Sequence, residues 1–187
     1  MRKKVMLRSK LSILVFLYTL SLATDSVASI GATTRLWSMV GSGCVPDSGT
    51  LASGQLGNTA VYGYLYFANT LPGTLRFTCP IQNAYPSAIT GTPTLDITYL
   101  DGDGTRGNCR VQVYVFRTST NSSGAGAQLA YIDSNFYSST TRTEVSHQLS
   151  ASVMDFENYY YWVYVQMDQI DNPGCTTQFF GVSIKNS

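Results

Sequence analysis

Residues 159–165 read Tyr-Tyr-Tyr-Trp-Val-Tyr-Val, and in an extended chain both faces of this segment are apolar. The pattern predicts a central strand of a sheet. Alternation assigns Tyr159, Tyr161, Val163 and Val165 to one face and Tyr160, Trp162 and Tyr164 to the other. Residues 179–184, Phe-Phe-Gly-Val-Ser-Ile, behave in the same way. The last part of the chain is therefore expected to supply central strands of a β-sheet.

Strand patterns continue through the rest of the chain, and helical spacing is nearly absent after residue 28. Runs rich in Val, Ile, Thr, Tyr and Phe alternate with clusters of Gly, Pro, Asn, Asp and Ser, which mark turns. The runs predict strands near Thr34–Met39, Thr59–Ala68, Gly73–Pro80, Thr94–Leu100, Arg110–Arg117, Ala127–Asp133, Thr143–Leu149, Tyr159–Met167 and Thr177–Lys185. About eight or nine strands with few two-residue turns favour an all-β antiparallel β-sandwich, jelly-roll-like or Greek key.

The first 28 residues have the composition of a secretory signal peptide. Basic residues at positions 2, 3, 4, 8 and 10 precede an apolar run at 11–23, and small residues reach Ala28. This run is shorter than the roughly 20 residues of a membrane-spanning helix, and no transmembrane segment is expected. We expect removal of residues 1–28 and secretion to the periplasm, the cell surface or the medium. Residues 29–187 are expected to form a single β-sandwich domain.

Removal of the signal peptide would change the charge of the protein. The number of basic residues falls from 12 to 7 and that of acidic residues from 11 to 10, so the net charge becomes −3. Lys185 is then the single lysine, and no basic stripe remains. Nucleic acid is therefore not an expected partner.

Four cysteines remain in the expected mature chain, and an even number in an exported protein predicts two disulfides. Three pairings are possible. We favour Cys44–Cys79 and Cys109–Cys175, because Cys109 and Cys175 each end a turn and begin a strand, and strands that start side by side would bring them together. No two cysteines have the close spacing of a zinc site.

Tyrosines give the strongest indication of a binding surface. In residues 61–67, Val61, Leu65 and Phe67 can enter a core while the intervening tyrosines share the other face. The candidate ligand-binding residues are Tyr62, Tyr64, Tyr66, Tyr160, Trp162 and Tyr164. An exposed aromatic platform can stack on sugar rings or contact another protein. The alternative is structural, since the same rings can pack between sheets or as cross-strand pairs.

Catalytic patterns are missing from the sequence. His147 is the single imidazole, and no Gly-x-Ser-x-Gly motif accompanies it. We therefore expect no enzymatic activity, no catalytic residue and no cofactor. Asp101 and Asp103 resemble the start of a calcium loop, but Arg106 and Gln112 stand where such a loop has glycine and glutamate. These two residues are calcium candidates only, and a turn explains them equally well.

The segments at 95–101, 111–117, 158–165 and 179–184 together resemble a group of secreted bacterial β-sandwich proteins, most of them uncharacterised. The similarity covers about the last 120 residues and lies in the strand pattern. It implies a jelly-roll-like fold in an exported protein, and it implies no site residues.

These observations predict an exported, non-enzymatic module that binds a glycan or a protein. The alternative is a structural subunit of a surface layer, filament or appendage, which would bind itself as a homo-oligomer. A secreted enzyme is a third possibility. Light scattering on residues 29–187 separates a monomeric binding module from a subunit that assembles.

Overall fold

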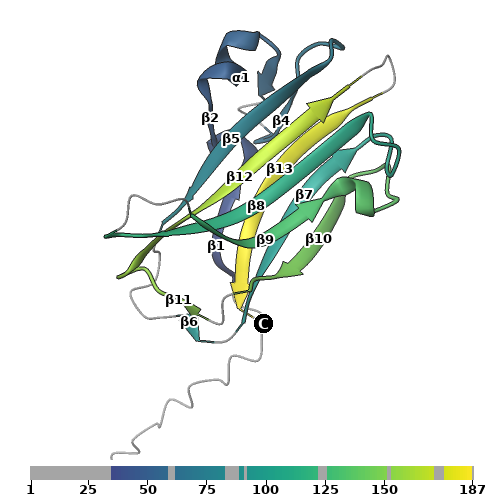
Figure 1. Cartoon of the computed structure of the whole chain (residues 1–187). Helices are drawn as coiled ribbons and strands as arrows, with labels where there is room; N and C mark the ends of the chain where they lie inside the picture. The colour runs from purple at the N-terminus through teal and green to yellow at the C-terminus, as the bar shows by residue number, and fades with distance from the viewer. Residues whose placement is uncertain are drawn as a thin grey trace, which may run out of the picture. The chain divides into compact units, whose positions relative to one another are not determined.

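The computed structural model describes residues 35–58, 62–82, 89–90, 92–121, 126–150, 153–170 and 175–186, most of which lie in two antiparallel sheets (Figure 1). Sheet A has the order β10 (Thr143–Gln148), β7 (Pro93–Asp101), β13 (Thr177–Asn186), β4 (Leu65–Phe67) and β3 (Leu56–Asn58), and β1 (Arg35–Val40) also pairs with β13. Sheet B has the order β2 (Val45–Pro46), β5 (Gly73–Ile81), β12 (Tyr159–Gln169), β8 (Cys109–Ser119) and β9 (Ala127–Asp133).

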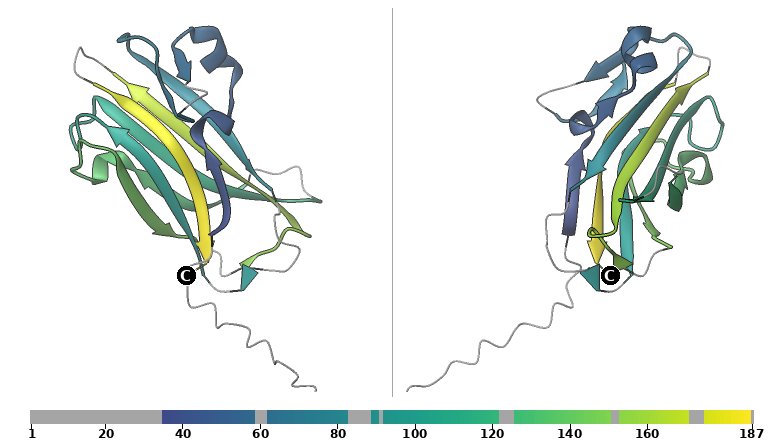
Figure 2. Two further views of the ribbon diagram at one scale, coloured as in Figure 1. Left: turned by 180° about the vertical axis from the view of Figure 1, so that it is seen from behind. Right: turned by 60° about the vertical axis from the view of Figure 1, so that its left-hand side comes forward.

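The chain crosses repeatedly between the sheets. From β4 in sheet A it passes to β5 in sheet B, to β7 in sheet A, to β8 and β9 in sheet B, and then to β10, β12 and β13 in alternate sheets. The final strand, β13, therefore lies between β7 and the first strands, β1 and β4, and Figure 2 shows it beside β1. This is the strand order of a jelly roll, which confirms the predicted fold.

Short elements account for the differences from the predicted strand list. Within the described residues, eleven strands belong to the two sheets, and β6 (Ile89–Thr90) and β11 (Val153–Met154) form a small separate pair. Strands of two or three residues, such as β2 and β3, are too short to show alternation. The sequence also did not predict three short helices, namely the 3-10 helices η1 (Gly41–Gly43) and η2 (Ser134–Phe136) and the helix α1 (Ser48–Ser53).

Helix α1 forms because its two ends are capped. The Asp47 carboxylate accepts a hydrogen bond from the Thr50 backbone N–H at 2.6 Å, and Gly54 ends the helix with a φ of 64°. The Thr50 hydroxyl then holds α1 to β5 through the backbone of Arg76, with distances of 2.6 and 3.2 Å. These contacts place α1 at the β2–β5 edge of sheet B (Figure 1).

The inward faces of the sheets form one hydrophobic core. Val111, Val113 and Val115 of β8 are fully buried, and alternation along β12 buries Tyr161 as the sequence predicts. Other fully buried side chains come from both sheets, namely Leu75, Leu95, Ile97, Tyr99, Val163, Val165, Met167, Phe179 and Ile184. Leu65 and Phe67 are also buried, whereas Val61 lies outside the described residues.

Both favoured disulfides are present. Cys44–Cys79 links the segment after β1 to β5, and Cys109–Cys175 links the first residue of β8 to the segment before β13. The starts of β8 and β13 lie close together, with 5.6 Å between the Cα atoms of Cys109 and Cys175, but the two strands belong to different sheets and are not paired neighbours. The bridge instead joins the two layers of the sandwich.

The expected signal peptide and residue Thr34 lie outside the described residues. No helix among the residues that the structure describes is long and apolar enough to cross a membrane.

Candidate functional site

The six candidate aromatic residues divide between the outer faces of the two sheets, so the structure does not bring them together. Tyr62, Tyr64 and Tyr66 lie in and just before β4 of sheet A. Tyr160, Trp162 and Tyr164 alternate with the core residues of β12 in sheet B. Two separate aromatic surfaces result.

Cross-strand register arranges the outward residues of sheet B in rows. The pairing of β5, β12, β8 and β9 gives the rows Pro80, Trp162, Phe116 and Gln128; Thr78, Tyr164, Tyr114 and Tyr131; Arg76, Gln166, Gln112 and Asp133; and Thr74, Asp168 and Arg110. We call these residues the sheet B face. Its first two rows hold all of its aromatic rings, and its last two carry amides and charges.

Ring contacts make the aromatic rows continuous. Trp162 stacks on Phe116 with 5.6 Å between ring centroids, and Phe116 stacks on Tyr114 at 5.9 Å. Tyr114 also contacts Tyr131 at 4.7 Å and Tyr164 at 5.9 Å. All five rings are partly exposed, so they offer one apolar surface to solvent.

The polar rows are held in place by their own hydrogen bonds. Gln112 Nε2 donates to the hydroxyls of Tyr114 and Tyr131 at 3.1 and 2.8 Å, which joins the third row to the second. Gln166 Nε2 donates to the Asp168 carboxylate at 3.0 Å. These side chains therefore have fixed positions before any ligand arrives.

An ion pair at the polar end of this face ties β8 to β9. Arg110 Nε lies 3.0 and 3.1 Å from the two carboxylate oxygens of Asp133, which is 2% exposed, and the Tyr131 hydroxyl donates to the same carboxylate at 2.7 Å. Burial alone would raise the pKa of Asp133, but hydrogen bonds from Arg110, Tyr131 and the Asn135 N–H together lower it below its ordinary value. Asp133 therefore stays ionised.

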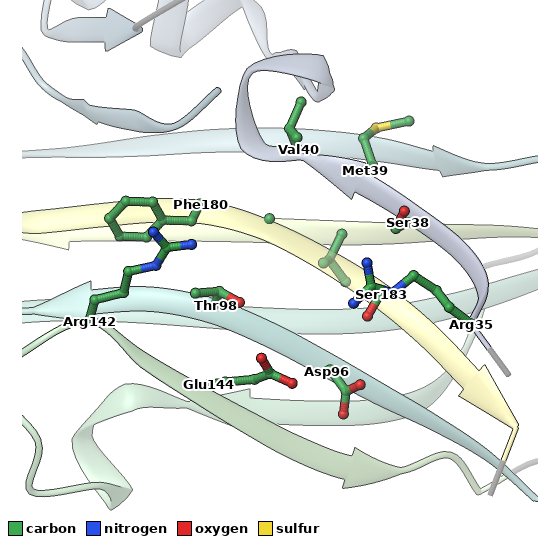
Figure 3. Close-up of a pocket in the computed structure, with 12 residues that line it drawn as sticks. Arg35, Ser38, Met39, Val40, Asp96, Thr98, Arg142, Glu144, Phe180 and Ser183 are labelled. Carbon is green, nitrogen blue, oxygen red and sulfur yellow. The ribbon is translucent and has the colours of Figure 1, made fainter. Parts of the chain in front are cut away.

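Sheet A carries a different surface, which begins with tyrosines and ends in a hollow. The ring of Tyr64 lies 6.3 Å from Tyr62, 5.6 Å from Tyr66 and 5.1 Å from Phe180. Phe180 faces outward because it alternates with the buried Phe179, and a bulge then interrupts the pairing of β13 with β7 between Phe179 and Gly181. Beyond Phe180 lies a hollow of about 320 Å³ (Figure 3).

Charged side chains surround this hollow. Arg142 places its guanidinium carbon 4.2 Å from the centre of the Phe180 ring, and Arg35 lies at the other end (Figure 3). Lys185 pairs with Asp96 and, at 3.2 Å, with Glu144. Its hydrogen bond to Asp96 raises the pKa of Lys185, so this lysine stays charged.

The two calcium candidates lie at the turn between β7 and β8. Asp101 and Asp103 approach one another near Cys109, but the Cys109 sulfur is in a disulfide and offers no thiolate. One Asp103 oxygen accepts the backbone N–H groups of Asn108 and Cys109, at 2.8 and 3.2 Å, which organises the turn. Calcium binding here stays a prediction.

Asp101 is expected to make stability depend on pH. It is fully buried, and burial raises its pKa from 3.8 to about 7. The folded state then holds a proton that the unfolded state releases between about pH 4 and pH 7, so the contribution of Asp101 to stability falls as pH rises through that window. For Asp101→Asn we expect stability to vary less with pH than in the wild type. Between pH 4 and pH 8, the variant should gain at least about 1 kcal/mol of stability relative to the wild type.

Urea unfolding at both pH values, in chelator, measures this difference. A variant whose profile matches that of the wild type would contradict the raised pKa.

Sequence reasoning missed several residues of both surfaces. Tyr114 and Phe116 alternate with the three buried valines of β8, so their outward position was available from the pattern. Tyr131 lies on β9 opposite Tyr114. Phe180 was harder to place, because Phe179 and Phe180 are both aromatic and the pattern does not show which of them faces the core. His147 is exposed on β10.

No protein-family model and no curated protein matches the chain. Solved structures with a similar arrangement include the xylan-binding module CBM15, at 14% identity over 71% of this chain and 82% of that one, with a TM-score of 0.41. Another is the CBM36-1 domain of a multidomain xylanase from the hindgut metagenome of Trinervitermes trinervoides, at 8% identity over 81% and 96% of the two chains, with a TM-score of 0.40.

A family two carbohydrate esterase from Cellvibrio japonicus is similar at 9% identity over 83% of this chain, with a TM-score of 0.40. The match spans 35% of the length of the esterase.

Proposed function

We propose that this protein is an exported glycan-binding module and that the sheet B face is its binding surface. The observation that carries the proposal is the change along that face from two rows of contacting rings to two rows of fixed amides and charged groups. A sugar has the complementary chemistry, because its C–H groups form an apolar face and its hydroxyls donate and accept hydrogen bonds at the rim.

The arrangement favours a glycan over a protein partner for two reasons. Trp162 and Phe116 are in direct cross-strand register and their rings stack at 25° to one another, and such a surface suits a flat ligand. The polar rows are already ordered, so hydroxyl groups can bind without the cost of ordering side chains. The partly exposed Gln166 amide has both a donor and an acceptor, as uncharged hydroxyls require, and the buried Gln112 amide holds it in place.

The cysteines support the exported location. All four form disulfides in the structure, and such bonds persist outside the reducing cytosol. Together with the expected signal peptide, they support a location outside the cytosol, where glycans of cell walls and extracellular matrices occur.

Trp162→Ala is expected to weaken binding of a neutral polysaccharide on the order of tenfold, because it removes a large ring from the contact. Affinity electrophoresis of the mature protein through gels that contain xylan, cellulose derivatives or β-glucan measures this loss. Tyr62→Ala is the matched control, since Tyr62 is 75% exposed on sheet A. Circular dichroism establishes that both variants are folded.

The proposal fails if no neutral polysaccharide retards the wild-type protein, or if Tyr62→Ala and Trp162→Ala reduce binding equally. Light scattering that shows a polymer would favour the structural subunit in its place.

A further inference from the structure

We infer that the hollow on sheet A is a second site, which binds a saccharide unit carrying an oxyanion, either a carboxylate or a sulfate ester. The inference shares with the proposed function only the assumption that the ligand is a glycan. It concerns a different sheet and an anionic ligand, whereas the proposed function concerns a neutral one.

Positive charge is concentrated at this hollow. Seven basic side chains remain after residue 28, and three of them, Arg35, Arg142 and Lys185, lie in or next to the hollow. Two carboxylates, Asp96 and Glu144, also line it, so the local balance is +1. The expected mature chain has a net charge of −3, and binding of an anion must therefore come from this local excess rather than from the whole protein.

Lys185 already forms ion pairs with both carboxylates. Its ammonium pairs with Asp96, which is almost fully buried, and with the more exposed Glu144. The second Asp96 oxygen accepts a hydrogen bond from the Ser146 hydroxyl at 2.5 Å. Within the described parts of the chain, Arg35 and Arg142 form no ion pair with a carboxylate, and their charges are free for a ligand.

The position of Arg142 suits an oxyanion. Its guanidinium carbon lies 4.2 Å from the centre of the Phe180 ring, and a guanidinium held against a ring can still donate hydrogen bonds to a carboxylate or a sulfate. The Tyr64 ring, 5.1 Å from Phe180, continues the apolar wall on which a sugar can stack. Arg142 and Phe180 lie at one end of the hollow in Figure 3.

Hydroxyl groups complete the lining. Ser38, Thr98 and Ser183 come from β1, β7 and β13 respectively, and all three line the hollow (Figure 3). No side-chain hydrogen bond engages these hydroxyls within the described residues, so they can bind the hydroxyls of a sugar. The hollow thus combines a stacking wall, a cation and neutral polar groups.

The experiment compares pairs of ligands that differ in charge. Polygalacturonic acid is tested against its methyl ester, and dextran sulfate against dextran, by isothermal titration with the wild-type mature protein. We expect the acidic member of at least one pair to bind about tenfold or more tightly than its neutral counterpart, and added salt to remove the preference. The pair that shows the preference identifies carboxylate or sulfate as the recognised group.

Two variants connect this preference to the hollow. Arg142→Ala is expected to lose the preference, while Arg106→Ala, which removes an exposed arginine from the β7–β8 turn, retains it. Glu144→Gln is expected to strengthen acidic binding about twofold or more, because it removes a repelling charge that is 57% exposed. Thermal unfolding shows whether each variant is folded.

Equal binding of the acidic and neutral ligands, or equal effects of Arg142→Ala and Arg106→Ala, would overturn the inference. Either outcome leaves the proposed function intact, because Trp162→Ala and a neutral polysaccharide test that separately. Conversely, if the wild-type protein binds no neutral polysaccharide, its preference for the acidic member of each ligand pair can still be measured.

Discussion

Replacing Cys109 and Cys175 together by serine is expected to lower the free energy of unfolding by about 4 kcal/mol. The disulfide closes a loop of 66 residues, and a cross-link over such a separation removes much of the conformational freedom of the unfolded chain. It also joins the start of β8 in sheet B to the segment before β13 in sheet A. The bridge therefore limits separation of the two sheets at that end of the sandwich.

Urea unfolding followed by tryptophan and tyrosine fluorescence measures this loss. The matched variant replaces Cys44 and Cys79, which are 35 residues apart, and its expected loss is smaller by only about 0.6 kcal/mol. A loss below about 1 kcal/mol for the Cys109 and Cys175 pair would contradict the prediction.

The fold was largely accessible from sequence because burial and alternation coincide in the long strands. Val111, Val113 and Val115 alternate with polar or aromatic residues, and in the structure the valines are fully buried. What alternation cannot supply is the sheet to which each strand belongs. The sequence therefore placed Cys109 and Cys175 correctly as a pair at neighbouring strand starts, but it did not show that the two strands belong to different sheets.

The candidate sites were less accessible, because a surface depends on which strands become neighbours. Tyr164 was recognised as outward, but its contact with Tyr114 follows from the register of β12 with β8, which lies far away in sequence. The hollow on sheet A depends on a bulge at Gly181 and on Arg142, a residue in a turn without any motif. Strand pairing and the bulge in β13, rather than amino-acid composition, determine both surfaces.

Arg110→Ala is expected to destabilise the protein by about 3 kcal/mol, because it leaves Asp133 buried without its cation. Asp133 is 2% exposed, whereas Arg110 is 35% exposed, so solvent screens one partner and the loss falls at the lower end of the range for buried pairs. Urea unfolding at pH 7 measures the loss. Arg106→Ala serves as the control for removal of one positive charge.

The pH profile distinguishes this mechanism from a simple loss of packing. In the wild type the lowered pKa of Asp133 means that its contribution to stability is present above about pH 4 and is lost as pH falls through the folded pKa. Without Arg110, burial dominates and raises that pKa, so acid should stabilise Arg110→Ala relative to the wild type. A destabilisation of Arg110→Ala that is equal at pH 3 and pH 7 would refute the electrostatic explanation.

Asp133 also orients the aromatic rows, since it accepts the hydrogen bond of Tyr131, whose ring contacts Tyr114. Adding Asp133→Asn to Arg110→Ala removes the buried charge, and we expect most of the stability to return. The double variant should nevertheless bind neutral polysaccharide more weakly than the wild type, because both groups belong to the polar rows of the sheet B face. Recovered stability with reduced binding would separate the structural role of the ion pair from its role at the surface.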